Sequence, residues 1–198
     1  MSKTLSLALS AEPTSWRLTD EQAGVPAEVR AAVLKRDRGT CRACGFMCDR
    51  YQEIHHIDGD HANHAPENLC VICSFCHLPH HLGRAGILEE GALVWLPELT
   101  QVQVSHMSRA LYVAFLSGGL WWSDEDDPVR ATPEVARIAG AASSLQTMLH
   151  ERIQAAEDRI GTRDPTVLGE ALMRLPPADY AKRARKLEGL RLFPCGNR

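Results

Sequence analysis

The chain has 198 residues, of which 44% are hydrophobic and 24% charged, and its formal net charge is −3. This length and hydrophobic content suit a globular chain with a substantial core. The slightly acidic balance disfavours nonspecific binding of nucleic acid, which depends on many lysine and arginine contacts to phosphate. The most apolar stretch, ALYVAFLSGGLWW at residues 110–122, is shorter than the roughly 20 residues that a membrane span needs, so we predict no membrane insertion.

Two elements are predicted before the cysteine-rich part of the chain. Leu5, Leu7 and Leu9 alternate with serine and alanine, which favours an N-terminal strand over an export signal. Residues 26–37, PAEVRAAVLKRD, begin with a proline and carry apolar side chains at helical spacing. They predict a short helix that leads directly into the first cysteine pair.

Cysteines are concentrated in the next segment, where six of the seven lie between residues 41 and 76. This clustering favours a metal site over a disulfide framework. Cys41 and Cys44 form one C-x2-C pair, and Cys73 and Cys76 form a second pair after 28 intervening residues. Each pair can offer two thiolates to a tetrahedral Zn2+, so we predict a structural zinc site. The remaining cysteines are expected to be free thiols or small apolar residues: Cys48, Cys70 and Cys195.

Histidines occur inside this cysteine frame. The stretch EIHHIDGD, residues 53–60, places His55 and His56 side by side on a predicted strand, where neighbouring side chains point to opposite faces. A short helix after Cys76 would bring His77 and His81 onto one helical face. Together with His55 they could hold a second divalent ion that keeps an open coordination position. The other histidines are expected to be structural or surface residues: His61, His64, His80, His106 and His150.

The rest of the chain is predicted to be mainly helical. Residues 87–98 contain a turn between two apolar runs, which favours a hairpin or a strand pair. Thr100 and Gln103 form a capping box at the start of a helix, and the acidic run at 124–127 is predicted to be a solvated linker. Three further helices are indicated by proline starts and glycine ends: 133–161, 164–175 and a basic helix at 177–189.

Three motifs in chain order, KRDRGTCRACG, IHHIDGD and ENLCVICSFCH, resemble the zinc-stabilised HNH endonucleases. The resemblance covers about 45 residues and implies a ββα-metal core, in which a hairpin and a helix surround a catalytic ion. It implies that His55 is a metal ligand, His56 is the general base and Asn68 orients that base. It also implies that His77 and His81 are metal ligands contributed by the helix.

A second resemblance extends along nearly the whole chain. The segments SWRL (15–18), RDRGTCRACGF (36–46), DGDHANHAPENL (58–69), WLPELTQ (95–101) and GTRDPTVLGEALM (161–173) are similar to the IcmJ/DotN family of type IVB secretion and related conjugation machines. The resemblance implies a zinc-bound adaptor associated with the coupling-protein ATPase. The HNH histidines are typically degraded in that family, whereas this sequence retains them.

Together these observations predict an α+β fold in which an HNH ββα-metal core carries a mostly helical C-terminal extension. The predicted division is a zinc-binding domain at 1–123, a linker at 124–131 and the extension at 132–198. Two functions follow from the resemblances. The first, slightly favoured, is a metal-dependent DNA endonuclease linked to a type IVB secretion or conjugation system, with structural Zn2+ and a catalytic Mg2+, Mn2+, Ni2+ or Zn2+. The alternative is a non-catalytic adaptor, and for both we expect a cytoplasmic protein, located at the inner face of the membrane if a secretion complex recruits it.

Overall fold

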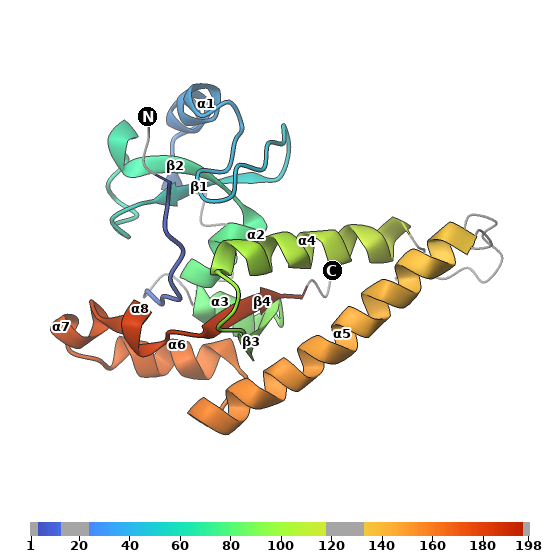
Figure 1. The fold of residues 1–198 in the computed structure, drawn as a ribbon. Helices are drawn as coiled ribbons and strands as arrows, with labels where there is room; N and C mark the ends of the chain where they lie inside the picture. The colour runs from blue at the N-terminus through green and yellow to red at the C-terminus, as the bar shows by residue number, and fades with distance from the viewer. Residues whose placement is uncertain (1–3, 13–23, 118–132, 196–198) are drawn as a thin grey trace.

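The computed structural model describes residues 4–12, 24–117 and 133–195 and has mixed helices and strands (Figure 1). The predicted α+β class is therefore confirmed. The elements in chain order are α1 (Ala27–Arg36), β1 (Gln52–His56), η3 (Pro66–Asn68), β2 (Leu69–Cys73), α2 (Ser74–His77), η4 (Leu78–His80), α3 (Leu82–Ile87), β3 (Gly91–Trp95), α4 (Gln101–Ser117), α5 (Pro133–Ile160), α6 (Pro165–Met173), α7 (Pro177–Tyr180), α8 (Arg183–Lys186) and β4 (Leu190–Pro194).

A two-stranded antiparallel hairpin followed by a short helix occupies the first half of the chain. Strand β1 pairs with β2, so that His55 lies opposite Cys70 and His56 opposite Leu69. Helix α1 covers this hairpin, and Val33 packs with Ile54 and Val71 in a buried cluster. Helix α2 begins immediately after β2. The second cysteine pair therefore spans the change from strand to helix.

The second sheet joins parts of the chain that lie far apart in the sequence, and the hairpin predicted at 87–98 is wrong. The residues predicted as the first strand of that hairpin begin with the end of helix α3. The second strand, β3, pairs instead with β4, with Leu93 opposite Leu192. Both leucines are fully buried, so the pairing provides each apolar side chain with a partner inside the core. Local patterns around residue 90 contain no information about a strand that begins at residue 190.

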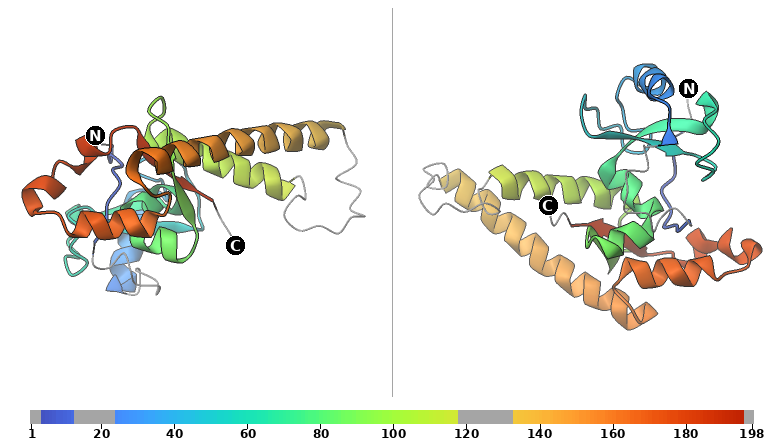
Figure 2. Two further views of the ribbon diagram at one scale, coloured as in Figure 1. Left: turned by 90° about the horizontal axis from the view of Figure 1, so that it is seen from below. Right: turned by 180° about the vertical axis from the view of Figure 1, so that it is seen from behind.

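The helices predicted after Thr100, at 133–161 and at 164–175 are confirmed as α4, α5 and α6. The capping box of α4 forms as expected: the Gln103 amide donates to Oγ1 of Thr100 at 3.3 Å, and the Thr100 amide donates to Oε1 of Gln103 at 2.8 Å. The carboxylate of Asp164 accepts from the Thr166 amide at 2.7 Å and caps α6. Helix α4 packs on β4 and α2, while α5 packs on β3 (Figures 1 and 2).

Two local predictions near the chain ends are wrong. Residues 4–12 contain no strand, because this segment bonds to separate parts of the chain: the Leu5 amide donates to the Arg42 carbonyl, and the Ser10 amide donates to the Pro79 carbonyl. The predicted helix at 177–189 is divided into the short helices α7 and α8. Gly189 then adopts a φ of +88°, which redirects the chain into β4.

The two parts of the predicted domain division share a sheet and a hydrophobic core. One buried cluster combines Leu82 and Leu93 from the first part with Leu168, Leu190 and Leu192 from the second. The predicted linker at 124–131 lies outside the described residues, and the division of the chain at this linker remains a prediction. Within the described ranges, the helices are too short or too polar to cross a membrane.

Candidate metal centres

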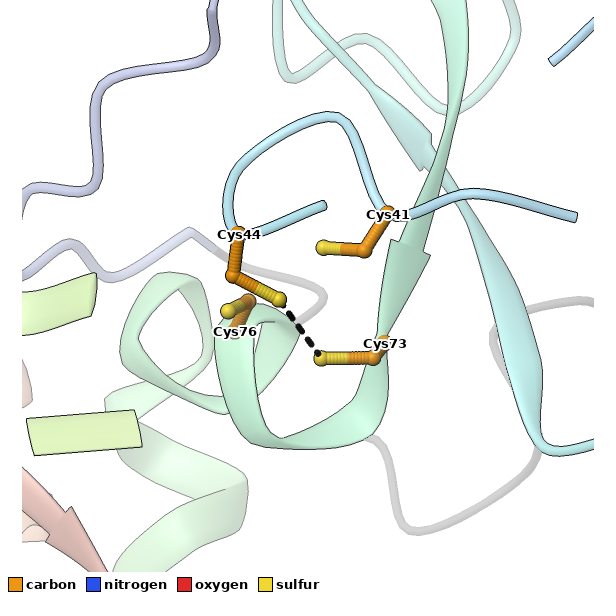
Figure 3. Close-up of side chains that lie close together, drawn as sticks. All are labelled: Cys41, Cys44, Cys73 and Cys76. Carbon is orange, nitrogen blue, oxygen red and sulfur yellow. Dashed lines mark hydrogen bonds between the residues drawn. The ribbon is translucent and has the colours of Figure 1, made fainter. Parts of the chain in front are cut away.

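The four predicted zinc ligands lie together beside the hairpin (Figure 3). Their sulfur atoms are all within 4.8 Å of one another, and the Sγ atoms of Cys44 and Cys73 are 3.8 Å apart. The loop of the first pair turns at Gly45, whose φ is +75° and whose amide donates to the Cys41 carbonyl at 2.8 Å. The second pair is positioned by the junction of β2 and α2, since Cys73 ends the strand and Cys76 lies one helical turn later.

The chemistry of this donor set fits a metal such as zinc. Interaction with Cys44 would raise the pKa of Cys41, but hydrogen bonds with Cys73 and Cys76 outweigh it and lower that pKa to about 6. The pKa of Cys76 is raised, first by Cys41 and then by Cys44 and Cys73. Only some of these crowded thiols can therefore ionise together in the absence of a cation. A bound Zn2+ would allow all four to act as thiolate ligands.

The other cysteines lie outside this cluster. Cys70 is buried in β2, and burial raises the pKa of its thiol to about 11. Cys48 and Cys195 are partly buried free thiols, and burial also raises the pKa of Cys195.

Three buried histidines form a second cluster. His55 comes from β1, His77 ends α2 and His81 lies between η4 and α3, and one ring nitrogen of each lies within 4.8 Å of the others. The Nε2 atoms of His77 and His81 are 3.0 Å apart. The single helix predicted after Cys76 is wrong, because the chain forms α2, η4 and α3 in succession and His81 has a φ of −127°. The break turns His81 back toward His77, so the rings still converge.

Glu53 is a functional candidate that the sequence reasoning missed. Its Oε2 atom lies 2.5 Å from Nδ1 of His77. Carboxylates commonly orient metal-binding histidines in this way, because they hold the Nδ1 proton and leave the Nε2 lone pair for the ion. Strand alternation could have revealed it, since Glu53 and His55 are two residues apart on β1 and share a face.

His56 lies outside the three-histidine cluster and faces other rings. Its ring stacks on His61 with centroids 4.8 Å apart, and the His64 centroid is 5.5 Å away. Its buried Nε2 has no hydrogen-bond partner among the described residues. Burial, followed by the effects of His61 and His64, lowers the pKa of His56, which favours the neutral, proton-accepting ring.

Asn68 holds the loop after His56. Its Oδ1 accepts from the Asp58 amide at 3.0 Å, while its Nδ2 donates to Oδ1 of Asp58 at 2.8 Å and to the Asn63 carbonyl at 2.9 Å. These bonds fix the turn that follows the strand. Through these contacts Asn68 holds the turn that follows His56. That Asn68 orients the His56 ring remains a prediction.

A cavity of about 600 Å3 opens beside the histidines. The N-terminal segment, the end of β1 and the region from α6 to α8 surround it, and its wall includes His55, His56, His80, Tyr180 and Arg183. His80 is an additional buried ring, with its centroid 4.4 Å from that of His55, and burial lowers its pKa to about 3. The cavity provides an approach to one side of the histidine cluster.

The fold and the sites define an α+β chain whose four-cysteine cluster could bind a metal such as zinc. No family model matches the chain. Over 200 aligned residues it is 28% identical to the type 4 apparatus protein DotN of Legionella pneumophila subsp. pneumophila, an alignment that covers 95% of this chain and 83% of DotN. This similarity supports the resemblance to the IcmJ/DotN family along the whole chain.

Proposed function

We propose that this protein is a metal-stabilised component of a type IV secretion apparatus that acts as an adaptor. The similarity to DotN carries this proposal, because it extends over 95% of the chain rather than only the cysteine and histidine motifs. A Zn2+ held by the four cysteines would tie the loop after α1 to the β2–α2 junction. Such a site contributes its binding energy to folding, which suits a small scaffold.

The long helices offer apolar surface to a partner. Val113 and Leu116 on α4 are 54% and 42% exposed, and Ile138 and Met148 on α5 are 44% and 45% exposed. Singly exposed apolar side chains are common on any protein, so these four support the proposal where they form one contiguous patch. The resemblance to IcmJ/DotN points to the coupling-protein ATPase of the secretion machine as the partner.

Affinity purification from a native host tests the adaptor function. We expect the tagged protein to recover the coupling ATPase, and the pair Val113→Asp and Met148→Asp to reduce that recovery while the melting temperature remains unchanged. Val167→Asp is a matched control, because Val167 is 50% exposed on α6. Recovery of no secretion component by the wild-type protein would contradict the proposal.

The second candidate function is metal-dependent hydrolysis of a phosphodiester, as the HNH resemblance implies. It is favoured by the convergence of His55, His77 and His81 next to a cavity. A divalent ion at these residues would polarise a phosphate oxygen. The ring of His56 lines the same cavity and would accept the proton of the attacking water.

Nearby basic residues give this second candidate limited support. Arg84 is paired with Glu90 at 3.1 Å, and Arg183 donates to the Leu9 and Tyr180 carbonyls. These groups are already engaged within the protein, and the chain is net acidic. Duplex DNA would therefore meet few free cations among the described residues near the cavity.

Plasmid cleavage with Mg2+, Mn2+, Ni2+ or Zn2+ tests the enzyme function. A nuclease would cleave with at least one ion and lose about 10²- to 10⁴-fold of its rate in His56→Ala, the usual contribution of a general base. The exposed His150 provides the control His150→Ala. Cleavage that persists at the wild-type rate in His56→Ala would indicate a contaminating nuclease.

A further inference from the structure

Arg109 on α4 contacts the four-cysteine cluster. Its Nη2 atom donates to Sγ of Cys73 at 2.9 Å and lies 3.8 Å from Sγ of Cys44. The guanidinium carbon is 4.0 Å from the centroid of the Phe46 ring and 5.3 Å from that of Phe75. The two aromatic contacts restrict the guanidinium to a position from which it can bond the sulfur.

The net charge of the metal-loaded site explains why a positively charged side chain lies beside it. Four thiolates around one Zn2+ carry a net charge of −2, and three of the four cysteines are buried. Buried charge is costly unless a partner balances it. Arginine remains protonated at any ordinary pH and presents fixed donors, so Arg109 brings a permanent positive charge to the centre.

We propose that Arg109 is a positioning residue of the four-cysteine metal centre, which it stabilises by donating a charge-assisted hydrogen bond to the Cys73 thiolate. This proposal rests on the proposed metal and is independent of whether the protein is an adaptor or an enzyme. The bond withdraws electron density from the sulfur. It therefore makes the metal-bound thiolate a weaker nucleophile and slows loss of the ion.

The same contact links the metal centre to the second half of the fold. Arg109 and Cys73 are 36 residues apart, and Ser105, one helical turn earlier on α4, donates to the Phe75 carbonyl at 3.0 Å. Helix α4 packs in turn with α5 through Val104, Leu111 and Leu149. Metal binding would thus stabilise the packing of α4 against the metal centre, because Arg109 bonds more strongly to a thiolate than to a neutral thiol.

Matched variants of the full chain test this role. Arg109→Gln removes the charge, Arg109→Lys retains the charge without the planar fork, and Arg137→Gln changes an exposed arginine of α5. We would measure zinc transfer to a chromophoric chelator, alkylation of Cys73 by iodoacetamide with peptide mapping, and the sulfur-to-metal charge-transfer bands of the Co2+ form. A charge-assisted bond predicts about tenfold faster zinc transfer and alkylation in Arg109→Gln. The sulfur-to-metal charge-transfer bands of Co2+-loaded Arg109→Gln should shift to lower energy than those of wild type. Arg109→Lys should give intermediate values in all three measurements, and Arg137→Gln should give wild-type values.

The outcomes separate this proposal from the metal site itself. A wild-type protein that contains no zinc and binds no Co2+ would overturn both. A zinc-loaded Arg109→Gln protein with wild-type transfer, alkylation and Co2+ bands would overturn only the role of Arg109. A lower melting temperature with unchanged Co2+ bands would also overturn it, because it would mean that Arg109 only packs between the two rings.

Discussion

The carboxylate of Glu53 and the ring of His77 form a direct contact, with Oε2 and Nδ1 separated by 2.5 Å. The opposite ring nitrogen, Nε2, lies 3.0 Å from Nε2 of His81. With the Nδ1–H group donating this hydrogen bond to the carboxylate, the lone pair of His77 lies on Nε2 and is directed toward the cluster. An ion between these rings would also relieve the close approach of the two nitrogens.

Glu53→Gln is therefore expected to weaken divalent-ion binding at the histidine cluster by about 10- to 100-fold, the usual effect of removing such an orienting group. Titration calorimetry with Zn2+ or Mn2+, on protein whose cysteine site is already loaded, measures this change. Glu67→Gln is the control, because Glu67 is exposed in η3. Equal affinities for Glu53→Gln and wild type would remove Glu53 from the site.

Cys73→Ser is expected to yield protein without bound zinc that is largely unfolded. Structural zinc contributes on the order of 10 kcal/mol of binding energy that is also folding energy. Elemental analysis and circular dichroism measure the two effects, with Cys48→Ser as a control that changes a cysteine outside the cluster. A Cys73→Ser protein that retains one zinc and melts like wild type would rule out this site.

Asp37 is expected to make stability depend on acid pH. Burial would raise its pKa, but hydrogen bonds from Arg36 and from the Val71 amide outweigh burial and lower that pKa below its ordinary value of 3.8. Because the folded pKa is the lower one, this stabilisation is present above about pH 4 and is lost as the pH falls through the folded pKa.

Denaturant unfolding of wild type and Asp37→Asn between pH 2.5 and pH 7 measures this dependence. The asparagine variant should be less stable at pH 7, by about 1 kcal/mol, and the difference should shrink as the pH falls below 4. Glu28→Gln changes an exposed carboxylate at the start of α1 and serves as the control. A constant difference over the whole pH range would assign the effect to packing rather than to charge.

Leu192→Ala is expected to destabilise the protein by about 2–5 kcal/mol, because it opens a cavity in the shared core. Leu192 is fully buried and lies opposite Leu93 in the second sheet. Chemical denaturation checks this value, and Leu116→Ala is the control at a 42% exposed position. A loss below 0.5 kcal/mol would mean that β4 contributes little to the fold.

The sequence alone determined the features that depend on short spacing. The paired cysteines, the helix at 26–37 and the capping box of Thr100 and Gln103 were predicted. The structure brings the cysteines and the capping residues together and forms the helix as α1. Each depends on residues within a few positions of one another, where backbone geometry limits the possible arrangements. The second cysteine pair also follows this rule, since strand and helix meet between its two members.

Only the tertiary structure decided the contacts between distant segments. The β3–β4 pairing joins residue 93 to residue 192, and Arg109 on α4 reaches Cys73 at the end of β2. The break before His81 redirects its ring toward His77. These arrangements depend on burial and charge pairing summed over the whole chain. A local pattern cannot specify them, because the same residues could form a hairpin, an exposed helix or a continuous helix if their distant partners were elsewhere.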